Sequence, residues 1–242
     1  MRQPTEWQWP QQIVALTEER NRPLYFTCKR CLDVVLTLLL LIVLAPLLLL
    51  IAVLIKLDTS GPVLFVQERV GARRRVKDGR TGWEIVLFPC YKFRSMIHGA
   101  DQSIHQAHIE AFVEGRVEMS DTAHASFKLM NDPRVTRVGR LLRKTSLDEL
   151  PQLLNVLRGE MSLVGPRPVP TYEVGKYGAH HWERLAVLPG ITGLWQVKGR
   201  CQVPFEDMVR LDIEYIRAQS LWLDLKIIVL TIPAVLSGRG AD

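Results

Sequence analysis

The segment 143–152, Arg-Lys-Thr-Ser-Leu-Asp-Glu-Leu-Pro-Gln, carries the residue types best suited to chemistry. Ser146 followed by Glu149 matches a capping box, which predicts the N-terminus of a helix near Ser146. Asp148 would then lie in the first turn, where the helix dipole and free backbone amides favour an ionised carboxylate. Such a carboxylate beside a divalent cation could bind the metal or attack phosphorus as a nucleophile. The structural alternative is a helix cap with a favourable first-turn charge.

Basic residues bracket this segment on both sides and indicate an anionic ligand. Arginine side chains match phosphate oxygens bidentately. Arg167 lies between two prolines, which stiffen its backbone and fix its direction; the alternative is a rigid surface loop. Together with the carboxylates, the following side chains predict phosphate chemistry: Arg137, Arg140, Arg143, Lys144, Arg158 and Arg167.

Other signatures of catalysis or metal binding are absent or weak in the sequence. It contains no Walker A motif, no G-x-G-x-x-G, no H-E-x-x-H and no G-x-S-x-G. Cys28 and Cys31 form a C-x-x-C without a second pair of ligands, which argues against a zinc site. Four residues at helical spacing offer a metal face, for which an exposed polar helix face is the alternative: His98, Asp101, His105 and His108.

An apolar segment must position this chemistry at a membrane. Residues 34–55 carry no charge and would form about 33 Å of helix, enough to cross a bilayer. Pro46, after Ala45, predicts a kink or break near the middle. Lysine and arginine flank both ends, so the positive-inside rule places both ends on the cytoplasmic face. A re-entrant helix-break-helix satisfies both observations; a straight transmembrane helix is the alternative.

The rest of the chain fits one catalytic domain. With 31 Lys+Arg, 25 Asp+Glu and 48% hydrophobic residues, the 242-residue chain has a net charge of +6 and is not disordered. We expect short strands at 63–66 and 84–88, joined by a basic loop with Arg73–Arg75 that faces lipid headgroups, an anionic ligand or solvent. Helices are expected over 97–126, from about Thr145, and over 221–236, the last at the membrane surface or in the core.

Several longer motifs resemble the bacterial sugar transferases called monotopic phosphoglycosyl transferases. The resemblance covers about residues 28–242. The matching segments are 29–33, 91–96, 145–152, 164–168, 189–196, 199–200 and 238–241, with Asp212, Tyr215, Ser220 and Asp224.

This resemblance implies a reaction and its residues. Members of the family move a sugar-1-phosphate from a UDP-sugar to a polyprenyl phosphate, usually undecaprenyl phosphate, and release UMP with Mg²⁺ as cofactor. The resemblance makes Asp148 the nucleophile that carries a covalent phosphosugar and Glu149 its partner, both linked to the metal. It makes the following residues phosphate or substrate ligands: Arg143, Arg167, Lys92, Arg94 and Arg200.

The resemblance also implies the architecture. We expect a mainly helical α/β protein with a polar lead-in (1–27), a re-entrant membrane helix (28–57) broken at Ala45-Pro46, and a small cytoplasmic catalytic domain (58–242). The catalytic domain would carry a short β-hairpin and surface amphipathic helices. The family breaks its re-entrant helix at Ser-Pro, whereas this chain has Ala-Pro.

The expected partners are the donor, the lipid acceptor and membrane lipid at the bacterial inner membrane, with no nucleic acid and with a homo-oligomer as an open option. Two other functions compete. One is a membrane-anchored basic scaffold for anionic lipid or nucleic acid, which would tolerate neutralisation of Asp148 and Glu149. The other is a membrane-bound phosphatase or nucleotidase that works through an aspartyl phosphate without a lipid acceptor.

Overall fold

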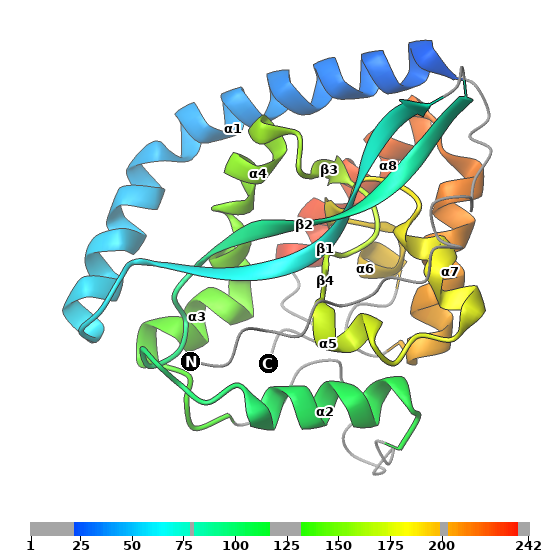
Figure 1. Ribbon diagram of the computed structural model, residues 1–242. Coiled ribbons are helices and arrows are strands. Elements are labelled where there is room, and N and C mark those ends of the chain that lie inside the picture. Colours follow the sequence, from blue (N-terminus) through cyan, green and yellow to red (C-terminus); the bar gives the residue numbers. More distant parts are fainter. Residues whose placement is uncertain (1–21, 78–79, 117–131, 199–202, 237–242) are drawn as a thin grey trace.

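The computed structural model describes residues 22–77, 80–116, 132–198 and 203–236, which form a mainly helical α/β protein with a β-hairpin (Figure 1). This agrees with the predicted fold class at that level. The predicted lead-in lies mostly outside the described residues. The α-helices are α1 (Pro23–Asp58), α2 (Ser103–Val113), α3 (Arg137–Thr145), α4 (Gln152–Arg158), α5 (Thr171–Val174), α6 (Leu194–Lys198), α7 (Phe205–Ala218) and α8 (Leu221–Leu236).

Helix α1 is long and apolar enough to cross a membrane, and 11% of its most apolar window is buried against the rest of the protein. Pro46 lies inside it and the helix continues through Ala45-Pro46, so of the predicted kink or break a complete break is absent, and the re-entrant path stays a prediction. Figure 1 shows α1 curving partway along its length. A proline removes a single hydrogen bond and crowds the preceding turn, which bending relieves without ending the helix.

Strands β1 (Leu64–Lys77) and β2 (Arg80–Phe93) form an antiparallel hairpin that contacts α1 near both of its ends (Figure 1). It is much longer than the predicted strands, and the expected basic loop is wrong because Arg73–Arg75 lie within β1. Partners far along the chain or across the hairpin stabilise these arginines. Arg74 stacks 4.8 Å from the Phe26 ring centroid, and Arg75 Nε donates to Glu84 Oε2 at 2.8 Å.

The remaining strands and two 3₁₀ helices connect these elements. They are β3 (Ser162–Val164), β4 (Val169–Pro170), β5 (Gly190–Thr192), η2 (Leu147–Glu149) and η3 (Ala179–Leu185). Strand β4 adds to the hairpin beside β1, and β3 pairs with β5 in parallel. The main core packs α4, β3, α7 and α8 together around Val156, Val164, Tyr215 and Ile227, so α8 is a helix as predicted, with one face in the core.

The segment after Thr145 departs from the predicted long helix. Ser146 has a left-handed backbone (φ 58°), ends α3 and makes no capping bond with its side chain, so the predicted capping box is wrong. The 3₁₀ helix η2 follows, and α4 begins only after Pro151, whose nitrogen cannot donate a hydrogen bond. Asp148 therefore lies in a single turn between two helices, where the argument from a long helix dipole does not apply.

Candidate active site

The predicted site residues within the described chain line one cavity of about 460 Å³. Strand β2 supplies one of them and the residue directly after β2 another, α3 supplies one, η2 two and the loop between β3 and β4 the last. They are Lys92, Arg94, Arg143, Asp148, Glu149 and Arg167. Arg200 lies outside the described residues. The cavity gathers residues spread over 76 positions of the sequence, although their individual roles stay predictions.

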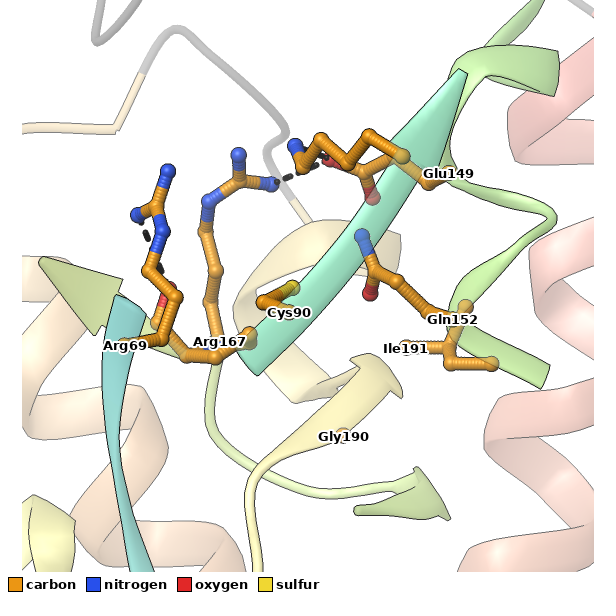
Figure 2. A pocket seen from close by; sticks show the side chains of 9 residues that line it. Arg69, Cys90, Glu149, Gln152, Arg167, Gly190 and Ile191 are labelled. Atoms are coloured by element: carbon orange, nitrogen blue, oxygen red, sulfur yellow. Dashed lines mark hydrogen bonds and ion pairs between the residues drawn. The ribbon is translucent and has the colours of Figure 1, made fainter. Parts of the chain in front are cut away.

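Glu149 is the centre of the charged contacts. Its Oε1 accepts from Lys92 Nζ at 2.7 Å and lies 3.2 Å from Arg167 Nη1. Figure 2 shows Arg167 reaching toward Glu149 above Cys90 and Gln152. The three charged side chains are each less than one-fifth exposed, so water screens these contacts only partly. Glu149 thus holds two cations in position for an anionic ligand.

Packing against α1 fixes the turn that carries the two carboxylates. Leu147 and Leu150 flank Asp148 and Glu149, and both pack against the cluster that contains Ile51 and Ile55 of α1. The left-handed conformation of Ser146 directly before the turn is uncommon for a residue other than glycine, and such backbone strain often occurs at functional sites. The apolar helix therefore supports the candidate nucleophile directly.

The loop that carries Arg167 is held by backbone contacts. Gly165 N–H donates to Thr192 O at 2.9 Å, and Gly190 N–H donates to Pro166 O at 2.7 Å. A Cβ at Gly165 would lie 2.4 Å from Leu188 O, so the close approach of these two chains requires glycine. This agrees with the predicted rigidity of the Pro-Arg-Pro turn.

Arg94 lines the cavity but already has partners in α1 and the turn after it. Its guanidinium donates to Thr59 O at 2.8 Å and to Ser60 O at 2.5 Å. These contacts satisfy carbonyl groups at the C-terminal end of α1. The structure thus gives Arg94 an anchoring contact between β2 and α1, and its predicted phosphate contact stays a prediction.

Arg69 is a neighbour of the site that the sequence analysis missed. It lies in β1, is 7% exposed, and donates to Gln67 Oε1 at 2.6 Å and to Pro168 O at 3.3 Å. Burial lowers its pKa, and the nearby Arg167 adds to this effect. In the sequence Arg69 is one of many arginines near the apolar segment, and only the pairing of β1 with β4 brings it beside the Arg167 loop.

The histidine metal face, which the sequence offered as one of two interpretations, does not form among the described residues. Within the part of the chain that the structure describes, the group close enough to share a metal ion is His180, His181 and Glu206, and it includes no residue of 98–108. His105 instead shares a hydrogen bond between its Nδ1 and Tyr172 Oη at 2.8 Å. The reason is that, within the described residues 97–116, the helix α2 covers 103–113, so His98 and Asp101 lie before it, and its inner side packs on the protein.

His105 predicts a pH dependence of stability. Burial, followed by the nearby positive charge of Arg69, lowers the pKa of His105 from 6.5 to about 3. Between these values the unfolded chain binds a proton that the folded protein does not, so stability should fall as the pH decreases below 6.5. One such proton accounts for at most about 1.4 kcal/mol per pH unit.

The substitution His105→Gln should flatten this dependence, because glutamine keeps hydrogen-bonding capacity but does not titrate. We expect the melting temperature to fall less for the variant than for the parent when the pH is lowered from 7 to 5, as measured by thermal unfolding in detergent. Parallel curves for the two proteins would contradict the assignment of the effect to His105.

Comparison with known proteins agrees with the geometry. A profile described as bacterial sugar transferase matches residues 24–238. The exopolysaccharide production protein ExoY of Sinorhizobium fredii is 41% identical over 220 residues, which cover 91% of this chain and 90% of that protein. The undecaprenyl-phosphate glucose phosphotransferase of Komagataeibacter xylinus is 44% identical over 241 residues, which cover 94% of this chain and 40% of that protein. The undecaprenyl-phosphate galactose phosphotransferase of Salmonella typhimurium is 40% identical over 213 residues, which cover 88% of this chain and 41% of that protein.

The chain thus spans less than half the length of the two phosphotransferases but nearly all of ExoY. The match of the profile to most of the chain, together with the ExoY relative, confirms the resemblance found in the sequence. The chain belongs to the bacterial sugar transferase family.

Proposed function

We propose that this protein transfers a sugar-1-phosphate from a UDP-sugar to a polyprenyl phosphate, such as undecaprenyl phosphate, and releases UMP. The observation that carries the proposal is one cavity in which Asp148 and Glu149 meet Lys92, Arg143 and Arg167, on a turn packed against the apolar helix α1. The names of the two undecaprenyl-phosphate phosphotransferases support the same chemistry.

The transfer would proceed in two displacements at one phosphorus. An Asp148 carboxylate oxygen attacks the phosphorus that carries the sugar, and the bond to the bridging oxygen breaks, so UMP leaves with that electron pair. A phosphate oxygen of the lipid then attacks the same phosphorus and displaces the Asp148 carboxylate, which regenerates the enzyme. Splitting the transfer in this way lets a soluble donor and a lipid acceptor use the site in turn.

The basic side chains would stabilise the charge of the diphosphate. Lys92 and Arg167 converge on Glu149 before substrate arrives, and Arg143 lines the same cavity. Positioned cations cost little reorganisation as negative charge moves to the leaving group. Glu149 would act as the positioning partner that holds two of these cations in place.

The two carboxylates also fit the Mg²⁺ that the family implies. Magnesium in proteins usually takes one or two carboxylates together with substrate phosphates, and Asp148 and Glu149 supply adjacent carboxylates in a cavity that basic side chains also line. Asp148 and Glu149 would hold the ion, which would neutralise phosphate charge.

Helix α1 would place this site at the level of the lipid headgroups. We extend the proposal to a re-entrant path with both ends of α1 on the cytoplasmic face of the inner membrane. Two observations support it: basic residues flank the apolar segment on both sides, and α1 bends near its middle (Figure 1). A lipid-linked phosphate cannot leave the bilayer, so the nucleophile has to lie at its surface.

The test is UMP release by the protein in nanodiscs with Mg²⁺ and a panel of UDP-sugars, with and without undecaprenyl phosphate. We expect UMP in amounts that depend on the lipid with at least one donor. Release that ignores the lipid would favour a hydrolase, and no release with any hexose or N-acetylhexosamine donor would favour the scaffold.

A further inference from the structure

We propose that four uncharged side chains of the same cavity, Gln67, Gln102, His105 and Tyr172, bind the hydroxyl groups of the transferred sugar and set which donor is accepted. This uncharged wall rests on the function proposed above and names the residues that would select its substrate. All four residues line the cavity that contains Asp148 and Glu149.

The uncharged wall comes from other elements than the charged residues that the sequence predicted for the site. Gln67 lies on β1, Gln102 and His105 lie at the start of α2, and Tyr172 lies on α5. Figure 1 shows α2 and α5 next to each other, and α5 follows directly on β4, which pairs with β1. The predicted charged site residues come instead from β2, α3, η2 and the Arg167 loop, whereas three other charged residues line the cavity beside the wall: Arg69 on β1, Asp101 and Arg134. The cavity therefore offers one substrate both a charged lining and a neutral one.

One hydrogen bond of the wall can be exchanged for a bond to a ligand, whereas His105 Nδ1 and Tyr172 Oη share a shorter one of 2.8 Å that holds these two side chains together. Gln67 Nε2 donates to Gln102 Oε1 at 3.4 Å, a long and exposed bond that a hydroxyl group could replace. Arg69 donates to Gln67 Oε1, and because a guanidinium only donates, this contact fixes the orientation of the Gln67 amide. Gln67 therefore presents its NH₂ group as a donor toward Gln102 and the ligand.

The wall suits neutral hydroxyls better than phosphates. A sugar hydroxyl both donates and accepts, and so do glutamine, tyrosine and neutral histidine side chains. Burial lowers the pKa of His105 to about 3, so its imidazole is neutral at physiological pH. The diphosphate would therefore bind Lys92, Arg143 and Arg167 and leave the wall to the sugar.

The nucleoside is the other neutral part of the donor, and the ring geometry disfavours it here. His105 and Tyr172 meet edge to face, with an interplanar angle of 77° and centroids 6.1 Å apart. They therefore form no pair of parallel faces between which a base would stack. The wall presents polar edges, which match the hydroxyls of a hexose.

The test measures binding without turnover. In an Asp148→Asn background in nanodiscs, Kd would be measured for UDP alone and for the UDP derivatives of glucose, galactose, N-acetylglucosamine and N-acetylgalactosamine. We expect the parent to prefer some sugars over others. Three substitutions test the wall: Gln67→Leu, Gln102→Leu and Tyr172→Phe. Each should reduce the ratio between the Kd of the weakest-binding and the tightest-binding UDP-sugar by about 3- to 10-fold, as expected for the loss of one neutral hydrogen bond. Each should change the Kd for UDP alone by less than about 2-fold.

The matched control is Gln106→Leu, which makes the same change on α2 at a residue that does not line the cavity. It should leave all five affinities unchanged. Unchanged sugar ratios in the wall variants, or a parent that does not discriminate, would overturn the inference. Equal losses for UDP and for every UDP-sugar would overturn it in favour of nucleoside binding.

Lipid-dependent UMP release by the protein with Asp148 intact separates this inference from the proposed function. Release without any response of the sugar ratios would reject the wall alone. If the wall variants change the ratios of Kd between UDP-sugars but the protein releases no UMP in response to lipid, the transferase function is rejected and the sugar site is retained.

Discussion

Replacing Asp148 with asparagine is expected to lower lipid-dependent UMP release by on the order of 10³-fold or more, because removal of a nucleophile abolishes the covalent route. Asp148 is half-buried in η2, and asparagine is close in size to aspartate, so the fold of the variant should persist. Intact-mass spectrometry after incubation with donor and Mg²⁺, without lipid acceptor, should detect one added sugar-phosphate group on the parent and none on the Asp148→Asn variant.

The neighbouring Glu149→Gln substitution is the matched control, because it makes the same carboxylate-to-amide change in the same turn. It removes the charge that Lys92 and Arg167 share, so we expect a partial loss of about 10- to 100-fold, as for a partner that orients others. The covalent adduct should still form, more slowly. An Asp148→Asn variant as active as its parent, or an adduct that persists in it, would remove Asp148 from the proposed role.

The long sequence motifs predicted the charged residues of the site better than they predicted the local secondary structure that carries them. Lys92, Arg143, Glu149 and Arg167 were all named from the sequence and all line one cavity. The predicted helix start at Ser146 was wrong because a capping pattern describes local hydrogen bonds, whereas the packing of Leu147 and Leu150 against α1 sets this turn.

The uncharged wall could not be predicted for a related reason. Gln67, Gln102 and Tyr172 belong to no motif, and the sequence analysis named His105 only in a possible metal face; β1, α2 and α5 bring the four together through tertiary packing. The length of the β-hairpin was underestimated for the same reason. Arg73–Arg75 resemble a solvated loop in sequence, but the Phe26 ring on α1 provides a stacking partner for Arg74.

A buried network joins the first turns of α1 to the rest of the protein. Asp224 on α8 is 1% exposed, and its Oδ2 lies 3.1 Å from Lys29 Nζ and accepts from Tyr25 Oη at 2.9 Å. Its Oδ1 accepts from Tyr215 Oη at 2.7 Å. One turn further on, Asp33 accepts from Leu163 N–H on β3 at 3.0 Å, just before the Arg167 loop. The packing of α1 against the rest of the protein therefore affects the position of the loop that carries Arg167.

The substitution Asp224→Asn should lower the free energy of unfolding by about 3–5 kcal/mol, because it leaves the buried Lys29 ammonium without its counter-charge. Denaturant or thermal unfolding in nanodiscs measures this loss. Activity should fall with it at temperatures where the parent is fully folded, since α1 also supports Leu147 and Leu150 beside the nucleophile.

Two controls separate the buried charge from a general effect of mutation. Glu214→Gln breaks the Lys198–Glu214 pair, whose side chains are about half exposed, and should cost less than about 1 kcal/mol. The double substitution Lys29→Met with Asp224→Asn removes both charges, keeps an amide oxygen that can accept from Tyr25 or Tyr215, and should cost less than Asp224→Asn alone. If Asp224→Asn costs no more than Glu214→Gln, Lys29 has another counter-charge, and Asp33, which also interacts with it electrostatically, is the residue that would supply it.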